Sequence, residues 1–245
     1  MLLKNKIALV TGGTGALGEK LCEVLSREGA HVAFNYQKHK DKAEKVLSII
    51  KSNKRKGLAF PCSITDAKAI EQMVEQIINK FNRIDILVNN AGITQVMPFP
   101  LIEEEDWDKM MAINVKGTFL ITKEVVRRMI AQRSGVIVSI GSIAAVRMLE
   151  VPVHYATSKA ALCGFTVSLA KELARYNIRV NSIISGMLES GISSNVPENK
   201  YKEYVKYCAA GRAGKPEEVA EFVAFLCSER ASYINAQNLS IDGGM

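Results

Sequence analysis

Two side chains with complementary chemistry stand four residues apart, at Tyr155 and Lys159. On a helix this spacing places both on the same face. A nearby ammonium group stabilises phenolate and lowers the pKa of tyrosine from its usual value of about 10 toward neutral pH. Such a phenol can exchange a proton with a substrate. A surface pair on an amphipathic helix is the alternative, so the surrounding residues decide its meaning.

Polar residues also follow two apolar segments that are short enough to be buried strands. Ser142 follows the segment from Val136 to Ile140, and Asn89-Asn90-Ala91-Gly92 ends the segment that begins at Ile84. The carboxyl ends of parallel strands meet at one edge of a sheet, where open α/β proteins bind ligands. We therefore expect Ser142 and Tyr155 to share a site at that edge.

A glycine-rich turn follows the first apolar segment. Thr11 to Gly18 reads TGGTGALG and contains G-x-G-x-x-G at Gly13, Gly15 and Gly18. Such glycines let backbone N–H groups approach a pyrophosphate at a helix N-terminus, whose dipole favours negative charge. No Gly-Lys-Ser/Thr follows, which excludes a Walker-type phosphate loop. The turn predicts a dinucleotide, with a ligand-free glycine turn as the alternative.

The residues after the second apolar segment bear on which dinucleotide binds. An acidic residue about 20 positions after the glycine turn would accept the ribose 2′-hydroxyl of NAD. The segment 34–40 reads FNYQKHK and has no acid, whereas Lys38 and Lys40 could pair with a 2′-phosphate. The sequence therefore favours NADP(H) over NAD(H), with ordinary solubilising lysines as the alternative.

These groups need elements to position them, and the chain alternates short apolar segments with amphipathic ones. The apolar segments are too short for helices and too apolar for half-exposed strands. The alternation predicts an α/β fold, a single Rossmann-like, doubly wound parallel sheet with helices on both faces, forming one domain over residues 1–245. The expected strands include 7–10, 32–34, 84–88 and 136–138, and the expected helices are 17–28, 41–51, 67–81, 107–131, 155–176 and 217–227.

Composition narrows the function classes. The chain has 245 residues, 48% of them hydrophobic and 23% charged, which is ordinary globular usage and excludes disordered and low-complexity classes. No apolar stretch reaches the length of a membrane span, and no cleavage site follows the N-terminus, so we expect a cytoplasmic protein without a membrane partner. Five widely spaced cysteines and three histidines predict neither a disulfide framework nor a metal site.

The net charge of +7 is compatible with nucleic acid, a phosphorylated ligand or an acidic protein partner. The densest basic run, Lys51 to Gly57, lacks interleaved aromatic residues and falls between a predicted helix and strand. It is typical of a solvated loop, and we expect no nucleic-acid binding.

Taken in order, Thr11 to Gly18, Asn89 to Gly92, Asn114, Ser142 and Tyr155 with Lys159 resemble the short-chain dehydrogenase/reductase family, over essentially the whole chain. The resemblance implies hydride transfer between a nicotinamide and a carbonyl or alcohol carbon. It implies that Tyr155 is the general acid in reduction and that Ser142 hydrogen-bonds the substrate oxygen. Asn114 would hold a proton-relay water, and Lys159 would lower the Tyr155 pKa and bind the nicotinamide ribose.

The resemblance also implies a set of cofactor contacts, and the chain departs from the family at some of them. Ala16 stands at the family's middle glycine, Ser63 at its usual adenine-contacting acid, Ser185 at a proline and Ser190 at a threonine. Without the fixed φ of proline we expect the loop after Ser185 to be looser. The implied cofactor contacts are Gly12, Thr14, Gly15, Leu17, Gly18, Asn35, Tyr36, Lys38, Ser63, Ile64, Asn90, Ala91, Gly92, Tyr155, Lys159, Gly186, Leu188 and Ser190.

Within the family the chain is most similar to 3-oxoacyl-[acyl-carrier-protein] reductases, through the segments 89–93, 155–165 and 211–220. This implies NADPH-dependent reduction of a 3-oxoacyl thioester on an acidic acyl carrier protein, in fatty-acid or polyketide-type synthesis, by a homotetramer. One alternative is a reductase or dehydrogenase of another carbonyl or alcohol, such as a sterol, polyol or small ketone. A dinucleotide-sensing regulator is the non-enzyme alternative.

Two groups of residues extend this prediction to the substrate. Substrate choice is expected to depend on residues 147–154 and on the segment after Gly191. His154 is expected to line the pocket because helix neighbours of Tyr155 point away from it. The expected apolar lining is Met148, Leu149, Val151, Val153, Met187 and Leu188. Basic residues on the two long helices would attract an acidic carrier to the cleft, with a solvated helix face as the alternative. These residues are Arg127, Arg128, Arg133, Lys171 and Arg175.

Overall fold

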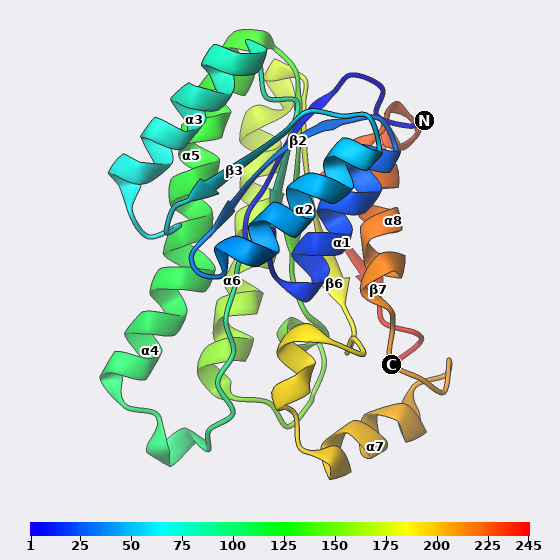
Figure 1. Ribbon diagram of the computed structural model, residues 1–245. Coiled ribbons are helices and arrows are strands. Elements are labelled where there is room, and N and C mark those ends of the chain that lie inside the picture. Colours follow the sequence, from blue (N-terminus) through cyan, green and yellow to red (C-terminus); the bar gives the residue numbers. More distant parts are fainter.

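The computed structural model, which describes residues 1–245, contains one seven-stranded parallel sheet in the order β3-β2-β1-β4-β5-β6-β7 (Figure 1). Every residue of β1 and of β4 is buried, because apolar side chains on both faces of these strands are covered by helices. The arrangement confirms the predicted Rossmann-like fold. The strands are β1 (Ile7–Val10), β2 (His31–Tyr36), β3 (Gly57–Pro61), β4 (Ile86–Asn89), β5 (Gly135–Ile140), β6 (Ile178–Ser185) and β7 (Asn238–Ile241).

Helices cover both faces of the sheet (Figure 1). On one face α1, α2 and α8 share an apolar core with the sheet, and on the other face α3, α5 and α6 share a second core. The helices are α1 (Ala16–Arg27), α2 (Lys40–Ser52), α3 (Ala67–Phe81), α4 (Glu104–Met111), α5 (Thr118–Gln132), α6 (Val153–Leu173), α7 (Glu198–Tyr207) and α8 (Pro216–Cys227).

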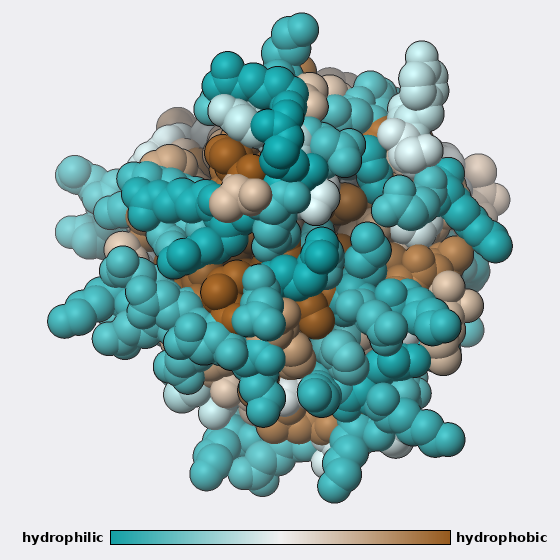
Figure 2. Space-filling view, turned by 90° about the horizontal axis from the view of Figure 1, so that it is seen from above, coloured by the Kyte–Doolittle hydropathy of each residue, from teal (hydrophilic) through white to brown (hydrophobic).

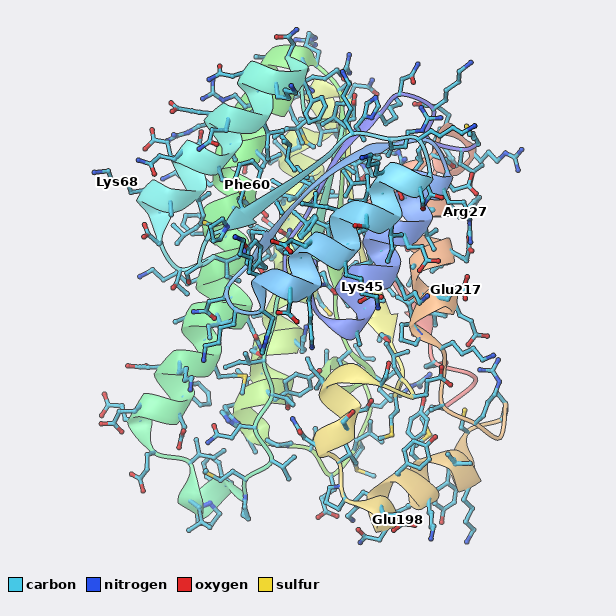
Figure 3. All side chains as sticks on the ribbon, viewed as in Figure 1. Arg27, Lys45, Phe60, Lys68, Glu198 and Glu217 are labelled. Atoms are coloured by element: carbon cyan, nitrogen blue, oxygen red, sulfur yellow. The ribbon has the colours of Figure 1, made fainter.

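Helices α1 and α8 pack side by side, and charged residues border their apolar contact. Arg27 of α1 faces Glu217 of α8, with 3.5 Å between a guanidinium nitrogen and a carboxylate oxygen (Figure 3). Both side chains are substantially exposed, so this pair adds little stability. The contact depends instead on buried residues such as Val24 and Ala220, which belong to the same core.

The expected helix 107–131 is helical throughout but is not α-helical along its whole length. The chain forms α4, then a π-helical segment from Ala112 to Gly117, and then α5. A Cβ added at Gly117 would lie 2.7 Å from Cδ1 of Ile64, so glycine allows this segment to pack against the loop after β3. π-Helical turns are frequent at functional sites, and this one contains Asn114.

Helix α7 has no counterpart among the expected helices. It lies at the bottom of Figure 1 with Glu198 at its outer end (Figure 3), and Tyr204 is its one buried residue. It contacts the segment after β7, where the Tyr204 hydroxyl bonds the Asp242 carbonyl, and Met245 packs against the same cluster as Tyr204.

The surface at the opposite end of the molecule is mostly hydrophilic. Figure 2 views this end from above and shows a hydrophilic rim with apolar residues visible between the polar ones. None of the helices combines the length and the apolar character needed to cross a bilayer.

The strand order determines where a ligand can bind. From β1 the chain adds β2 and β3 on one side, and then returns to place β4 on the other side of β1. The helices that follow β1 and β4 therefore lie on opposite faces, and a crevice opens between them at the carboxyl ends of these strands.

Candidate active site

A cleft of about 1140 Å³ lies at this carboxyl edge. It is lined by residues that follow β1, β2, β3, β4, β5 and β6, and by the loops around α7. Every cofactor contact implied by the family resemblance lines it, as do Ser142, Tyr155 and Lys159. Asn114 does not line it and is buried behind it. Residues separated by more than 170 positions in the chain thus share one cavity.

The glycine turn after β1 is held in place by Asn35 at the end of β2. The N–H of Gly12 donates to Oδ1 of Asn35 over 3.0 Å, and the N–H of Gly13 donates to the backbone carbonyl oxygen of Asn35 over 3.0 Å. The Asn35 amide in turn donates to the Cys62 carbonyl over 2.7 Å. Asn35 is buried, so its side chain supports the turn and is occupied by protein partners.

The first turn of α1 provides the donors for an anion. Its N-cap residue, Gly15, makes no side-chain capping bond, so the first N–H groups of the helix have no partner from a cap. Their partial positive charge at the helix N-terminus favours a phosphate.

Two glycines of the turn are required by close packing. A Cβ added at Gly18 would lie 2.1 Å from the carbonyl oxygen of Gly12, and one added at Gly13 would lie 2.6 Å from the Phe34 side chain. The methyl group of Ala16 faces Gly191: a Cβ added at Gly191 would lie 3.2 Å from the Ala16 Cβ. The Ala16 side chain thus packs against the loop before α7.

Thr11 joins the ends of β1 and β4, a role that the sequence analysis missed. Its hydroxyl oxygen accepts hydrogen bonds from the N–H groups of Asn90 and Ala91, each over 2.9 Å. The Asn90 amide returns a bond of 2.8 Å to the Thr11 carbonyl. These bonds fix the loop 90–92 against the glycine turn.

The cleft end beside β2 has lysine but no acid. Lys38 is exposed and lines the cleft, whereas Lys40 lies outside it and is 3.8 Å from Glu44 in its own helix. The side-chain carboxylates that line the cleft, Glu150 and Glu203, belong to the loop before α6 and to α7. Only one of the two predicted lysines therefore faces the ligand position.

The three polar groups at the centre of the cleft come from β5 and α6. The oxygen of the Ser142 hydroxyl accepts a bond of 3.2 Å from the N–H of Ala144, which leaves its hydrogen free to donate. Lys159 is buried and donates to the Ile140 carbonyl over 2.8 Å. Burial lowers the pKa of Lys159 to about 8.

The pKa of Tyr155 differs from the expectation. Burial raises it above the ordinary value, and the neighbouring Ser142 hydroxyl opposes this shift. The Lys159 ammonium lies 5.9 Å from the centroid of the tyrosine ring and is directed to the Ile140 carbonyl, so it does not lower the phenol pKa in the protein alone. Tyr155 consequently keeps its proton at neutral pH.

Asn114 connects the loop after β4 to the helix that carries Tyr155. Its oxygen accepts from the N–H of Ile93 over 2.9 Å, and its amide donates to the Ile93 carbonyl over 3.0 Å and to the Ser158 hydroxyl over 2.9 Å. Ser158 donates onward to the Tyr155 carbonyl over 2.7 Å. Both amide hydrogens therefore have partners within the protein, and these bonds connect the loop after β4 to α6.

The apolar end of the cleft agrees only in part with the expected pocket. Met148, Leu149, Val151, Met187 and Leu188 line it as predicted. Val153 is exposed outside it, and the expectation that His154 lines it is wrong. His154 is buried, and its Nε2 lies 3.4 Å from Oε1 of Gln95. Ile192 and Val196, from the expected segment after Gly191, also line it. Further lining residues were not expected from the sequence, namely Thr94, Val96, Ile113, Tyr204, Tyr207 and Met245.

A sequence signal was available for two of these residues. Tyr201, Tyr204 and Tyr207 recur at helical spacing of three, which indicates one face of a helix. The contribution of Met245 had no such signal, because only the folded chain brings its C-terminus to the cleft.

The basic residues of the long helices lie away from the cleft, which corrects the expectation that they flank it. Helices that follow a parallel strand run back toward the amino edge of the sheet, and Arg127, Arg128 and Arg133 are in or just after the second half of α5. None of these three lines the cleft. Arg127 and Arg128 instead approach Glu124, at 3.0 and 3.7 Å.

Comparison with known proteins agrees with this geometry. A family model described as "Enoyl-(Acyl carrier protein) reductase" matches residues 13–245. The chain belongs to the short-chain dehydrogenase/reductase family. One curated relative is 3-oxoacyl-[acyl-carrier-protein] reductase FabG of Thermotoga maritima, 37% identical over 100% of this chain and 99% of the relative. The protein of the same name from Aquifex aeolicus is 39% identical, over 99% of this chain and 98% of the relative.

Solved structures of this family have the same fold. A short-chain dehydrogenase/reductase from Serratia marcescens superposes with a TM-score of 0.93 and 36% identity, covering 100% of this chain and 99% of that one. An NAD⁺-bound xylitol dehydrogenase superposes with a TM-score of 0.91 and 28% identity, covering 100% of both chains. The chain is therefore an NAD(P)-dependent oxidoreductase.

The residues present fit a nicotinamide dinucleotide. The uncapped first turn of α1 suits a pyrophosphate, and the close contacts of Gly13 and Gly18 keep this turn tight. At the other end of the cleft, the N–H of Leu188 has no hydrogen-bond partner in the chain. Between these ends the buried ammonium of Lys159 lies next to the phenol.

The lowered pKa of Lys159 predicts a pH dependence of cofactor binding. The ammonium is charged below about pH 8 and becomes neutral as the pH rises through that value. An anionic dinucleotide is attracted by the charged form, so its affinity should fall as the pH rises through this range. Fluorescence titration from about pH 6.5 to 9.5 measures this, and Lys159→Met should remove the step. A step of equal size in Lys159→Met would assign it to another group.

Proposed function

We propose that the protein reduces 3-oxoacyl thioesters carried by an acyl carrier protein, with NADPH as the reductant. The observation that carries this proposal is that one cleft is lined by Ser142 and Tyr155, by the expected dinucleotide contacts and by apolar side chains such as Met148. The printed activity of the curated relatives supports the choice of substrate.

Four side chains have separate roles in this reaction. Ser142 donates its free hydrogen to the substrate oxygen, since its own oxygen already accepts from Ala144. Tyr155 keeps its proton because burial raises its pKa, and it delivers this proton to the same oxygen as negative charge develops there. Lys159 binds the nicotinamide ribose, and Asn114 holds the first turn of α6 in place through Ser158. When bound, the nicotinamide supplies the hydride.

The test follows nicotinamide absorbance with an acetoacetyl thioester, using NADPH and NADH side by side. A crotonyl thioester serves as a second substrate. It is an enoyl thioester, and the description of the matching family model names an enoyl reductase. We expect oxidation of NADPH with acetoacetyl and not with crotonyl thioester. Dinucleotide binding without oxidation on either thioester would favour a reductase or dehydrogenase of another carbonyl or alcohol, or a dinucleotide sensor.

The cofactor preference depends on Lys38, which lines the cleft where an acid would be expected for NAD. Lys38→Glu should weaken NADPH binding about tenfold or more, because it replaces attraction to the 2′-phosphate by repulsion, and should leave NADH binding nearly unchanged. Lys40→Glu is the matched control, since Lys40 lies outside the cleft. Equal effects of the two variants on NADPH would refute the role of Lys38.

We also propose a homotetramer. The outer faces of α5 and α6 expose Phe119 and Val167, with 45% and 46% of their surfaces accessible. Exposed apolar residues on two long neighbouring helices suit association with another copy of the chain. Sedimentation equilibrium measures the mass of the assembly.

A further inference from the structure

The hydroxyl of Tyr204 joins three parts of the chain near the cleft. It accepts a hydrogen bond of 3.1 Å from the N–H of Met187, after β6, and donates one of 3.0 Å to the carbonyl of Asp242, after β7. The tyrosine itself belongs to α7 and is only 6% exposed. One side chain thus attaches α7 to the segments that follow two neighbouring strands.

Gly186 makes this close approach possible. A Cβ added at Gly186 would lie 2.5 Å from the Tyr204 hydroxyl oxygen and 2.8 Å from Cα of Asp242. Any other residue at position 186 would therefore displace the tyrosine or the end of β7. The observed position of the Tyr204 hydroxyl therefore requires glycine at position 186.

The segment 185–188 is held by hydrogen bonds to two other parts of the chain. The N–H of Gly186 donates to Ile241 over 3.0 Å, and the carbonyl of Met187 accepts from Gly214 over 2.9 Å. The Tyr204 hydroxyl adds the bond to the N–H of Met187. Next in the chain is Leu188, which lines the cleft with its N–H unbonded.

Helix α7 is also connected to the opposite side of the cleft. Lys200, one turn before Tyr204, lies 2.5 Å from a carboxylate oxygen of Glu150 in the loop that precedes α6. Both residues line the cleft. Helix α7 is thus joined at Lys200 to the loop before α6 and at Tyr204 to Met187.

We propose that Tyr204 is a positioning residue that couples α7 to the segment 186–188 and holds the N–H of Leu188 ready for the nicotinamide carboxamide. The inference rests on the proposed function for its cofactor site. Burial raises the pKa of Tyr204, so its hydroxyl keeps the proton that it donates to Asp242.

Tyr204→Phe tests this because it removes one oxygen and keeps the ring. We expect hydrogen exchange at the Met187 amide to accelerate about tenfold, while exchange at Gly186, which donates to Ile241, changes little. The Kd for NADPH should rise about three- to tenfold, the factor that one ordinary hydrogen bond provides. The Kd for 2′-phospho-ADP-ribose, which lacks the nicotinamide ring, should not change.

Tyr201→Phe is the matched control, on the same helix but outside the cleft lining and without a side-chain hydrogen bond. It should leave both dissociation constants unchanged. Equal weakening of the two ligands by Tyr204→Phe, or of neither, would overturn the positioning role. If the unmodified protein binds NADPH but reduces no 3-oxoacyl thioester, the proposed substrate fails while the binding measurements still test Tyr204.

Discussion

Replacing Tyr155 by Phe is expected to lower the rate of thioester reduction by about 10²- to 10⁴-fold, the range that general acid catalysis contributes. The variant lacks the proton that the buried phenol holds at neutral pH. It keeps the ring and therefore the packing of α6. Because Lys159 and the glycine turn are unaltered, dinucleotide affinity should change by less than about twofold.

Steady-state kinetics and fluorescence titration on the same preparation separate the two effects. Tyr233→Phe is the matched control, since Tyr233 is fully exposed, at 102% of its reference area, and lies outside the cleft. It should have normal kcat and normal affinity. Near-normal turnover of Tyr155→Phe would remove Tyr155 from the proposed mechanism.

Gly18→Ala is expected to weaken dinucleotide binding by more than about 100-fold. The new methyl group would be placed 2.1 Å from the Gly12 carbonyl oxygen, and a backbone atom of a tight turn cannot move aside as a flexible side chain can. The turn must open, which displaces the N–H groups that are expected to bind the pyrophosphate. Crowding of this kind also costs about 1–3 kcal/mol of stability.

Titration calorimetry and thermal unfolding measure the two consequences of Gly18→Ala. Gly15→Ala offers a sharp comparison within the same turn, because its added Cβ meets nothing closer than the Gly12 oxygen at 3.5 Å. We expect the Gly15 variant to be clearly the milder of the two. If both variants bind the dinucleotide equally well, the steric account of the turn is wrong.

The buried ammonium of Lys159 has a cost in the folded protein. Removing a charged group from water disfavours its charged form, which is why its pKa falls to about 8. One hydrogen bond, to the Ile140 carbonyl, compensates part of this cost. A buried cation beside a cleft that suits a dinucleotide is typical of a functional position. At such positions the protein is less stable than it would be with an apolar side chain in the same place.

Much of the site was predictable because its signals are local. The glycine spacing of Gly13, Gly15 and Gly18, and the four-residue spacing of Tyr155 and Lys159, can be recognised in one short stretch each. The α/β alternation then predicts a parallel sheet, and a parallel sheet brings the ends of its strands to one edge. This chain of reasoning explains why all the expected cofactor contacts line one cleft.

The sequence was less informative about which residues from remote segments lie close together in the folded protein. His154 is adjacent to Tyr155 in sequence yet is buried against Gln95, because neighbours on a helix point in different directions. Arg133 follows one of the long helices but lies at the end away from the cleft, since α5 runs back along the sheet. The π-helical segment within the expected helix 107–131, where Gly117 packs against Ile64, is not revealed by helical periodicity.

The sequence by itself determined the fold class, the dinucleotide turn and the identity of the central hydroxyls and ammonium. Tertiary structure alone decided that Thr11 joins β1 to β4, that Asn114 supports Tyr155 through Ser158, and that Tyr204 attaches α7 to the ends of β6 and β7. The reason is physical. Periodicity and motif spacing report interactions within one element, whereas these hydrogen bonds form between segments whose separation is set only when the helices pack on the sheet.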